Sequence, residues 1–468
     1  MFIEKLAEYC EKFDSYAMPP EVVEAAKLKV LDAIGCALAA GNTETARIFK
    51  RYAETYAGRG DVPIWGGGTA SATEAAYVNG VLAHALLHDD TDLESGHPEC
   101  MIVPAALAAT KPHGSGINLL AGIALGYEIM WRASGCGDVV TGSLGRGFRG
   151  YVVNGMLGAA VSAGKVLELS KDGYVAALSC AANVVCGLLE SVGLATVERA
   201  IMAGVNARSG LQGAMLGKCG VVGTPSIFEG PQGYFRAVGG LINVDTERLL
   251  RGLGGKHRIL ESLYKRYPSA GANQSAIYAA EIFQKRHRPN PELVRSVTVW
   301  QYPLFGEAVP VDDGKPAYPS IVSTGPYENV EQTLPNKPFS VASMLLNGVY
   351  DSRTIVSGLN NERVRDLAKK VKSHGRDSYG PMDAAIEVVM SDGQKIIEVV
   401  SCNDDPRFFP KLGDMQSRLE AMCGKSVGSR EIARLVEAVS LLDKEDGLSR
   451  LDKVLRTVTI SESGKDGQ

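Results

Sequence analysis

The chain of 468 residues lacks the features that mark membrane, secreted or nucleic-acid-binding proteins. No apolar run reaches the roughly 18 residues of a transmembrane helix, so we expect no membrane contact. The formal net charge is −4 and no basic block stands out, which argues against nucleic acid as a partner. The start, MFIEKLAEYCEKF, is charged and amphipathic, unlike a secretory signal, and too acidic for a typical transit peptide. We therefore predict a cytoplasmic protein.

Paired cysteine motifs and nucleotide-binding motifs are also missing. The nine cysteines are scattered, which is typical of free thiols in a reducing compartment. The glycine-punctuated stretch 220–235 lacks both the strand–GxGxxG–helix context of a dinucleotide site and the lysine of a phosphate loop. We therefore expect no cofactor.

What the chain does have is 53 glycines and many alanines, which suit closely packed helices. Long helical patterns joined by short loops fill the first half of the chain. Beyond it, strand composition at 296–304 and a hairpin signal at Asp392-Gly393 appear between helical patterns at 339–347, 361–372 and 428–442. We predict a mainly α fold with an all-α domain (1–265), a smaller α+β domain (266–402), and C-terminal helices (403–468) that return to the first domain.

The stretch 71–106 carries the densest chemical signal. Ser71 and Glu74 have capping-box spacing, and the apolar positions that follow predict a helix that ends near His88. A polar loop follows and contains His97. Four of the seven histidines lie within about thirty residues of each other, at positions 84, 88, 97 and 113. A helix end that leads into such a loop is a plausible place for proton transfer.

Each of these residues also has a plainer interpretation. His84 and His88, four residues apart, fit two satisfied helix histidines better than two metal ligands, and we expect no metal. Asp89 and Asp90 would be poorly placed as free charges at a helix C-terminus, which favours a paired or functional role.

The same stretch resembles the signature of the MmgE/PrpD family, which includes 2-methylcitrate dehydratases, cis-aconitate decarboxylases and iminodisuccinate epimerases. Further similar motifs follow in the expected order along nearly the whole chain: GFRGYVVNGMLGAA, RAIMAGVNARSG, FEGPQGYF, KRYPS, NKPFSVASMLLNG and NDDPRFFPKLGD. The resemblance implies a large helical domain and a smaller α+β domain, a homodimer, and an active site between the two domains.

The chain keeps part of the family's signature and departs from the rest. It retains Asp89, Asp90, Thr91, His97 and Pro98, and Lys265 matches the lysine of the family's KxYP motif. The departures are Leu87 for an aspartate, Arg149 for a histidine, Arg199 for a lysine, Met202 for a second histidine, and Leu144 for the tyrosine of the epimerases.

The resemblance implies a polycarboxylate substrate, and proton removal beside a carboxylate needs fixed cations and an acid/base pair. We expect His97 and Lys265 as that pair, with Asp90 orienting His97 or pairing with an arginine. For substrate binding we expect Asp89, Thr91, Arg149 and Arg199, since guanidinium groups suit bidentate carboxylate pairing.

Three functions stay open at this point. The first is a cofactor-independent lyase of the 2-methylcitrate dehydratase type. The second is an isomerase or epimerase that uses two bases, and the third is a non-catalytic ligand-binding homologue. The lost aspartate, histidine and lysine argue against straightforward cis-aconitate decarboxylation.

Overall fold

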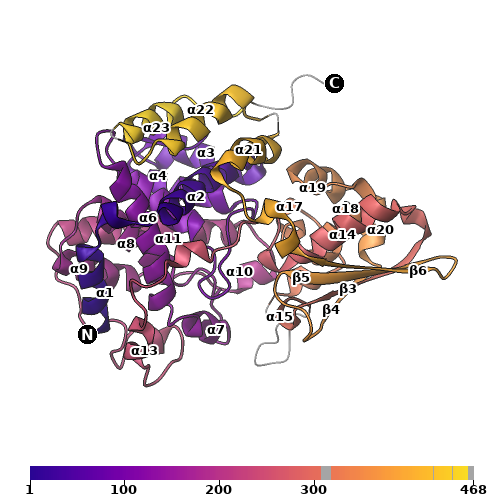
Figure 1. Ribbon diagram of the computed structural model, residues 1–468, viewed down its shortest axis with the longest axis horizontal. Helices are drawn as coiled ribbons and strands as arrows, with labels where there is room; N and C mark the ends of the chain where they lie inside the picture. Colours follow the sequence, from indigo (N-terminus) through magenta and orange to yellow (C-terminus); the bar gives the residue numbers. More distant parts are fainter. Residues whose placement is uncertain (307–317, 425, 445, 462–468) are drawn as a thin grey trace.

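The computed structural model describes residues 1–306, 318–424, 426–444 and 446–461. Figure 1 shows a large helical lobe, built mainly by the first half of the chain, beside a smaller lobe of helices and one sheet. The expected mainly α fold with a smaller α+β region is confirmed. None of the described helices combines the length and apolarity needed to cross a membrane. All nine cysteines are free thiols, as expected.

The helical lobe is a cluster of helices of mixed length. They are α1 (Phe2–Lys12), α2 (Pro20–Ala39), α3 (Glu44–Tyr56), α4 (Ala72–His84), α5 (Glu99–Ala108), α6 (Gly116–Ala133), α7 (Asp138–Leu144), α8 (Gly155–Val166), α9 (Lys171–Ala182), α10 (Glu190–Gly193), α11 (Glu198–Lys218), α12 (Tyr234–Ala237) and α13 (Thr246–Leu250). The short antiparallel strands β1 (Val62–Pro63) and β2 (Thr69–Ala70) lie before α4.

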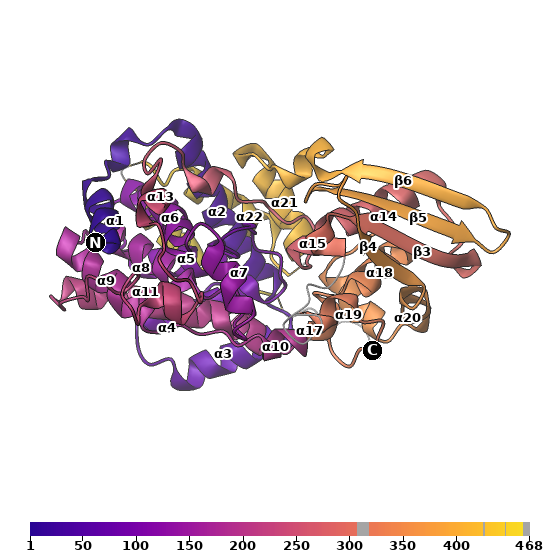
Figure 2. The ribbon, with the colours of Figure 1, turned by 90° about the horizontal axis from the view of Figure 1, so that it is seen from below.

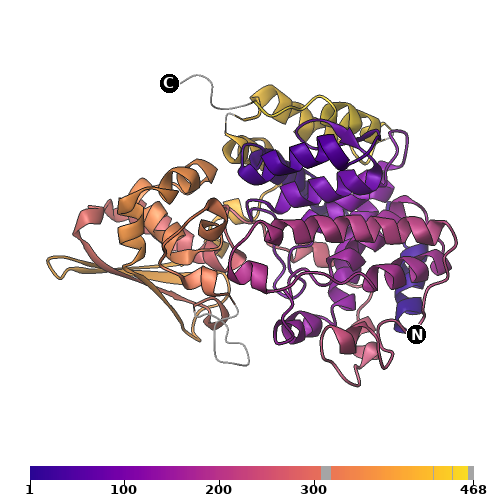
Figure 3. The ribbon, with the colours of Figure 1, turned by 180° about the vertical axis from the view of Figure 1, so that it is seen from behind.

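Helix α11 packs against α4, α8 and α9 at the centre of this lobe. Small residues allow the close approach: a Cβ on Gly204 would lie 2.4 Å from the Tyr77 carbonyl oxygen of α4, and one on Gly210 2.4 Å from the Cβ of Ala159 in α8. Figure 3 places the amino terminus on the side of this lobe that faces away from the sheet.

The smaller lobe is built around a four-stranded sheet, with strand order β4-β3-β5-β6 (Figure 2). Strands β3 (Val294–Gln301) and β4 (Val371–Gly375) run parallel, whereas β5 (Asp383–Met390) is antiparallel to both β3 and β6 (Lys395–Ser401). The helices of this lobe are α14 (Gln274–His287), α15 (Pro303–Gly306), α16 (Pro319–Val322), α17 (Val330–Thr333), α18 (Lys337–Asn347), α19 (Ser352–Leu359) and α20 (Glu362–Ala368).

After β6 the chain returns to the helical lobe. Helices α21 (Met415–Cys423) and α22 (Ser429–Ser440) pack on α2, and α23 (Gly447–Leu455) packs on α22, so the yellow helices lie beside α2 in Figure 1.

Three local predictions need correction. The pattern at 361–372 gives a shorter helix, α20, followed by strand β4, whose sequence VKSHG carries little strand signal. Helix α4 starts after Ser71, but no capping box forms: the Ser71 hydroxyl donates to the Ala57 carbonyl, and Glu74 accepts from Tyr52. The helix ends at His84, not near His88.

Candidate active site

A cavity of about 120 Å³ lies where the two lobes meet. Four side chains predicted to act in catalysis or binding line it: His97, Arg149, Arg199 and Lys265. Thr91 lines it as well, while Phe305, Tyr318 and Ile321 form the wall on the side of the smaller lobe. The structure therefore brings together residues that are up to 174 positions apart, and their chemical roles stay predictions.

Main-chain contacts hold the segments that carry His97 and Lys265 side by side. Thr91 and Leu263 exchange N–H···O hydrogen bonds of 2.9 and 2.8 Å, which place the loop after α4 beside the segment that carries Lys265. Gly96 has a φ of +103°, and a Cβ there would lie 2.2 Å from the Tyr151 carbonyl oxygen. Glycine is therefore required at the residue that sets the approach of His97.

His97 has the hydrogen bonding of a neutral base. Its Nδ1 lies 3.0 Å from the Asp90 carbonyl oxygen, which only accepts hydrogen bonds, so Nδ1 carries the proton and Nε2 a lone pair. Burial, together with the nearby Lys265, holds the pKa of His97 well below its usual range. At neutral pH the ring is therefore uncharged, and its Nε2 can accept a proton but has none to donate.

His84 and Asp89 are buried next to His97. Asp89 accepts from His84 Nδ1 at 3.0 Å and lies 3.6 Å from His97 Nδ1. Burial alone would raise the pKa of Asp89, but His84 and Lys265 lower it well below its usual range. Burial lowers the pKa of His84 to about 3, so a neutral His84 bridges a carboxylate and, through Nε2 at 2.9 Å, the guanidinium of Arg149.

Lys265 is fully buried, and its ammonium donates to the Leu87 carbonyl at 3.0 Å and lies 3.7 Å from Asp89 Oδ1. Leu87 directs its carbonyl there from a left-handed conformation with a φ of 52°. That conformation costs a non-glycine residue about 1–2 kcal/mol. Leu87 also lines the cavity, so this strained residue both accepts the hydrogen bond from Lys265 and forms part of the cavity wall.

The two arginines are not equally available to a ligand. Arg199 donates to the carbonyls of His84 and Ala85 and pairs with Glu331 at 2.6 Å, so three of its five N–H groups are used. Its Nε is buried and has no partner among the described residues. Arg149 donates to His84 and to the Arg199 carbonyl, at 2.9 and 3.0 Å, so three of its five N–H groups have no partner among the described residues. Burial and the neighbouring Arg199 lower the pKa of Arg149 to about 10, and it stays charged.

The structure revises the expected roles of the two aspartates. The Asp90 carboxylate points away from the cavity: it accepts from Tyr127 at 2.6 Å, pairs with Lys29 at 3.0 Å, and bonds to Ser262. Asp90 orients His97 only through its main-chain carbonyl. Asp89 was expected to bind substrate, but it is buried behind His84 and His97 and is not a wall of the cavity. Both aspartates are paired, as their position after a helix suggested.

The nitrogen and oxygen ligand atoms of His84, Asp89 and His97 lie within 4.8 Å of one another, as in a metal site. The hydrogen bonds of His84 disagree with that role, because its Nδ1 donates to Asp89 and its Nε2 accepts from Arg149. Neither ring nitrogen of His84 then has a lone pair for a metal. Lys265 and Arg149 beside them also disfavour a further cation. The donor set therefore does not fit a metal ion.

Sequence reasoning missed the contributions of the smaller lobe. Tyr318 lines the cavity with a buried hydroxyl that has no hydrogen-bond partner among the described residues, and Glu331 holds Arg199. Neither residue sits in a recognisable motif, because both reach the site only through the packing of the two lobes. Leu144 lies one layer away, against Leu189 and Val192.

Comparisons with known proteins agree with this architecture. The cis-aconitate decarboxylase-like protein oryM of Aspergillus oryzae is 24% identical over 464 residues, which cover 93% of both chains. Cis-aconitate decarboxylase of Homo sapiens is 28% identical over 220 residues (46% of this chain, 45% of the relative), and that of Aspergillus terreus is 27% identical over 312 residues (62% and 61%). The family model of the MmgE/PrpD N-terminal domain matches residues 4–246, which is more than half of the chain. The chain therefore belongs to the MmgE/PrpD family.

Proposed function

We propose that this protein is a cofactor-independent lyase of the dehydratase type, acting on a small di- or tricarboxylate such as 2-methylcitrate or a related acid. One observation carries the proposal: a neutral histidine with a lone pair shares a small cavity with a charged, largely unpaired Arg149. That combination supplies a base and a fixed positive charge beside it.

In this mechanism a substrate carboxylate pairs with Arg149, and the adjacent C–H faces His97. His97 Nε2 takes the proton while the electron pair of the C–H bond becomes the new carbon–carbon double bond. The carbon–oxygen bond breaks, and the leaving hydroxyl takes a proton from Lys265 and departs as water. Arg149 stabilises the charge that develops on the carboxylate, which is where a preorganised cation accelerates the reaction most.

The relatives support the substrate class. Their names assign them to cis-aconitate, a tricarboxylate, and decarboxylases and dehydratases are both lyases. This chain has Arg149 and Arg199 at positions where the family pattern has a histidine and a lysine, and Arg149 is the one that would pair with a substrate carboxylate. Arginine does not exchange protons near neutral pH, so proton transfer falls to His97 and Lys265. We also propose a homodimer, which sedimentation analysis would test.

An isomerase is the second candidate, because two groups able to exchange protons, His97 and Lys265, line the same cavity. One of these groups would remove a proton from one face of the substrate and the other would donate a proton to the opposite face, so the product would form without loss of water.

The test is incubation with 2-methylcitrate, cis-aconitate and related diacids in ordinary and in heavy water. The dehydratase predicts growth of the absorbance of an unsaturated acid. Deuterium incorporation without loss of water would indicate the isomerase instead, and evolution of carbon dioxide would indicate a decarboxylase. Binding without any of these changes would contradict both candidate reactions and leave a non-catalytic binding protein.

A further inference from the structure

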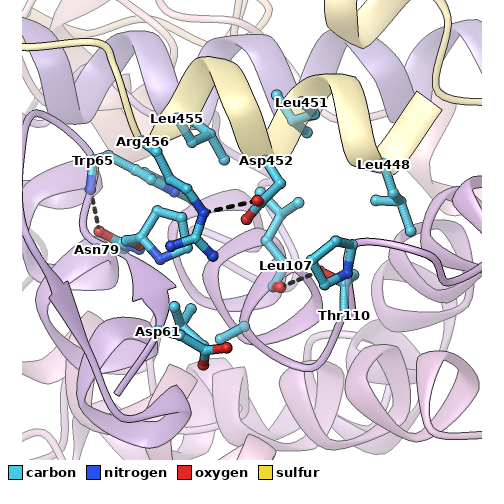
Figure 4. Close-up of a pocket in the computed structure, with 14 residues that line it drawn as sticks. Asp61, Trp65, Asn79, Leu107, Thr110, Leu448, Leu451, Asp452, Leu455 and Arg456 are labelled. Atoms are coloured by element: carbon cyan, nitrogen blue, oxygen red, sulfur yellow. Dashed lines mark hydrogen bonds and ion pairs between the residues drawn. The ribbon is translucent and has the colours of Figure 1, made fainter. Parts of the chain in front are cut away.

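Among the cavities that the described residues form outside the candidate active site, one lies under α23 and another beside α21. The first, under α23, has a volume of about 50 Å³, which suits a few water molecules. Figure 4 shows its arginine, Arg456, turned toward Asp452 of the same helix, with Nε 2.7 Å from the carboxylate. This cavity has too little room for an organic ligand.

The second cavity is much larger, about 650 Å³, within the range of small-molecule sites. It lies between the start of α19, helix α21, the segment that follows α4 and the segment that precedes α14. Its apolar wall includes Leu86, Pro268, Met344, Val349 and Met422.

His88 is the unusual polar group in this wall. It is only 6% exposed, and its Nε2 has no hydrogen-bond partner among the described residues. Burial, with Arg418 beside it, lowers the pKa of His88 to about 3, so the ring is neutral. A buried nitrogen without a partner is costly, and this one lines an open cavity. The sequence-based interpretation of His88 as a satisfied helix histidine is therefore wrong.

Arg418 supplies a charge next to His88. Its Nε pairs with Asp32 at 2.8 Å and its Nη2 donates to the Lys265 carbonyl at 2.8 Å. Its Nη1 makes no hydrogen bond within the described chain, so one face of the guanidinium is available to an acid group in the cavity.

The same two chain segments contribute residues to the walls of both cavities. In the segment after α4, Leu86 and His88 face the large cavity while Leu87, between them, faces the candidate active site. Before α14, Lys265 faces the candidate active site, whereas Arg266 and Tyr267 face the large cavity. A ligand that moved His88 or Arg418 would therefore act on the two backbone segments that position Lys265.

We propose that the large cavity is a second small-molecule site, which takes a ligand with an apolar body and one carboxylate-like acid group, and that its occupancy is communicated to Lys265. The acid group would pair with Arg418 Nη1, and the body would cover the apolar wall beside the neutral His88 ring. The site does not depend on the proposed reaction, although the communication assumes that a polycarboxylate binds beside Lys265.

The test uses 1-naphthoate as probe and 1-naphthalenemethanol as its uncharged match, both titrated by calorimetry. We expect one equivalent of 1-naphthoate to bind with a Kd below about 1 mM, and the alcohol to bind at least fivefold more weakly. Ala421→Trp, on the cavity face of α21, should weaken naphthoate binding at least tenfold. Gln416→Trp is the matched control, since Gln416 is exposed on the same helix and does not line the cavity.

Absence of naphthoate binding, or equal binding by the Ala421→Trp variant, would overturn the site. Ser417→Trp, one turn earlier on the same face, repeats the test if the first variant melts at a lower temperature. Equal affinity for the alcohol would overturn the acid group. For the communication, saturating naphthoate should change the Kd of tricarballylate, an unreactive tricarboxylate, at least threefold. An unchanged Kd of tricarballylate would overturn the proposed communication between the two cavities. Failure of tricarballylate to bind at all would count against the proposed function alone.

Discussion

The loop that follows α4 separates two clusters of buried charge that solve the same electrostatic problem in opposite ways. On the cavity side, three cations (Arg149, Arg199 and Lys265) face two carboxylates (Asp89 and Glu331). On the core side, three carboxylates (Asp32, Asp90 and Glu99) face two cations (Lys29 and Arg418).

The core side balances its charge within the protein. Lys29 pairs with Asp90 and Arg418 with Asp32, while neither oxygen of Glu99 has a hydrogen-bond partner in the described part of the chain. Burial, with Asp32 and Asp90 nearby, raises the pKa of Glu99 well above its usual range, so this carboxyl holds a proton. On the cavity side, no described group offsets the one surplus positive charge in this way. The comparison teaches that an anionic ligand would complete the charge balance of the cavity.

Removal of a cation from the core should have the largest effect on stability. Lys29→Met leaves Asp90 buried without its partner, and we expect the free energy of unfolding to fall by about 3–5 kcal/mol. Denaturant titration measures this change. Lys27→Met is the control, since its partner Asp443 is 22% exposed, and it should cost about 1 kcal/mol or less. Equal losses in the two variants would contradict the account of the core.

Removal of a cation from the cavity should affect activity instead. Arg149→Met should lower kcat/KM by about 10²–10³-fold. Burial and Arg199 already lower the pKa of Arg149, so its charge costs the fold free energy and stability should be unchanged or slightly higher. Steady-state kinetics and thermal melting measure the two effects. Arg146→Met, on the exposed part of the same loop, should change neither, and a matching loss of activity there would argue against a specific role.

Acid should destabilise the protein through His84 and His88. Both stay neutral in the folded state, with pKa values of about 3, whereas the unfolded chain binds protons below about 6.5. Stability therefore falls as pH falls from 6.5 toward 3, by at most about 1.4 kcal/mol per pH unit for each histidine. His88→Asn should reduce the slope of unfolding free energy against pH. His113→Asn, at an exposed histidine, should leave it unchanged; identical slopes in all three proteins would refute this assignment.

The smallest effect should come from a neutral replacement in the core. Glu99→Gln removes a carboxyl that already holds a proton, so the free energy of unfolding at pH 7 should change by less than about 1 kcal/mol. Asp89→Asn, on the cavity side, replaces a charged acceptor and should cost about 1.5–3 kcal/mol. If Glu99→Gln costs as much as Asp89→Asn, Glu99 is ionised and the charge comparison is wrong.

Much of the fold followed from the sequence, because periodic apolar residues and small packing residues act locally. Strand β3, the hairpin β5–β6 and helices α18 and α22 lie within a few residues of their expected positions. Strand β4 was missed because its pairing with β3, not its own composition, makes it a strand.

The site was only partly predictable for a related reason. The motifs identified His97, Lys265 and Arg149, which the structure places around one cavity. They could not show which of two adjacent aspartates faces His97, since the turn at Leu87 uses a left-handed conformation that no glycine announces. Tyr318, Glu331 and the partnerless His88 gain their positions only from contacts between distant segments.

The most direct test of the central claim compares His97→Gln with the unaltered protein, with both binding and turnover measured on the acid that the substrate panel identifies. If His97 removes a proton from an acid held by Arg149, the variant should bind tricarballylate within about threefold of the unaltered Kd and lose at least about 10²-fold in turnover. Unchanged turnover by His97→Gln would contradict the account.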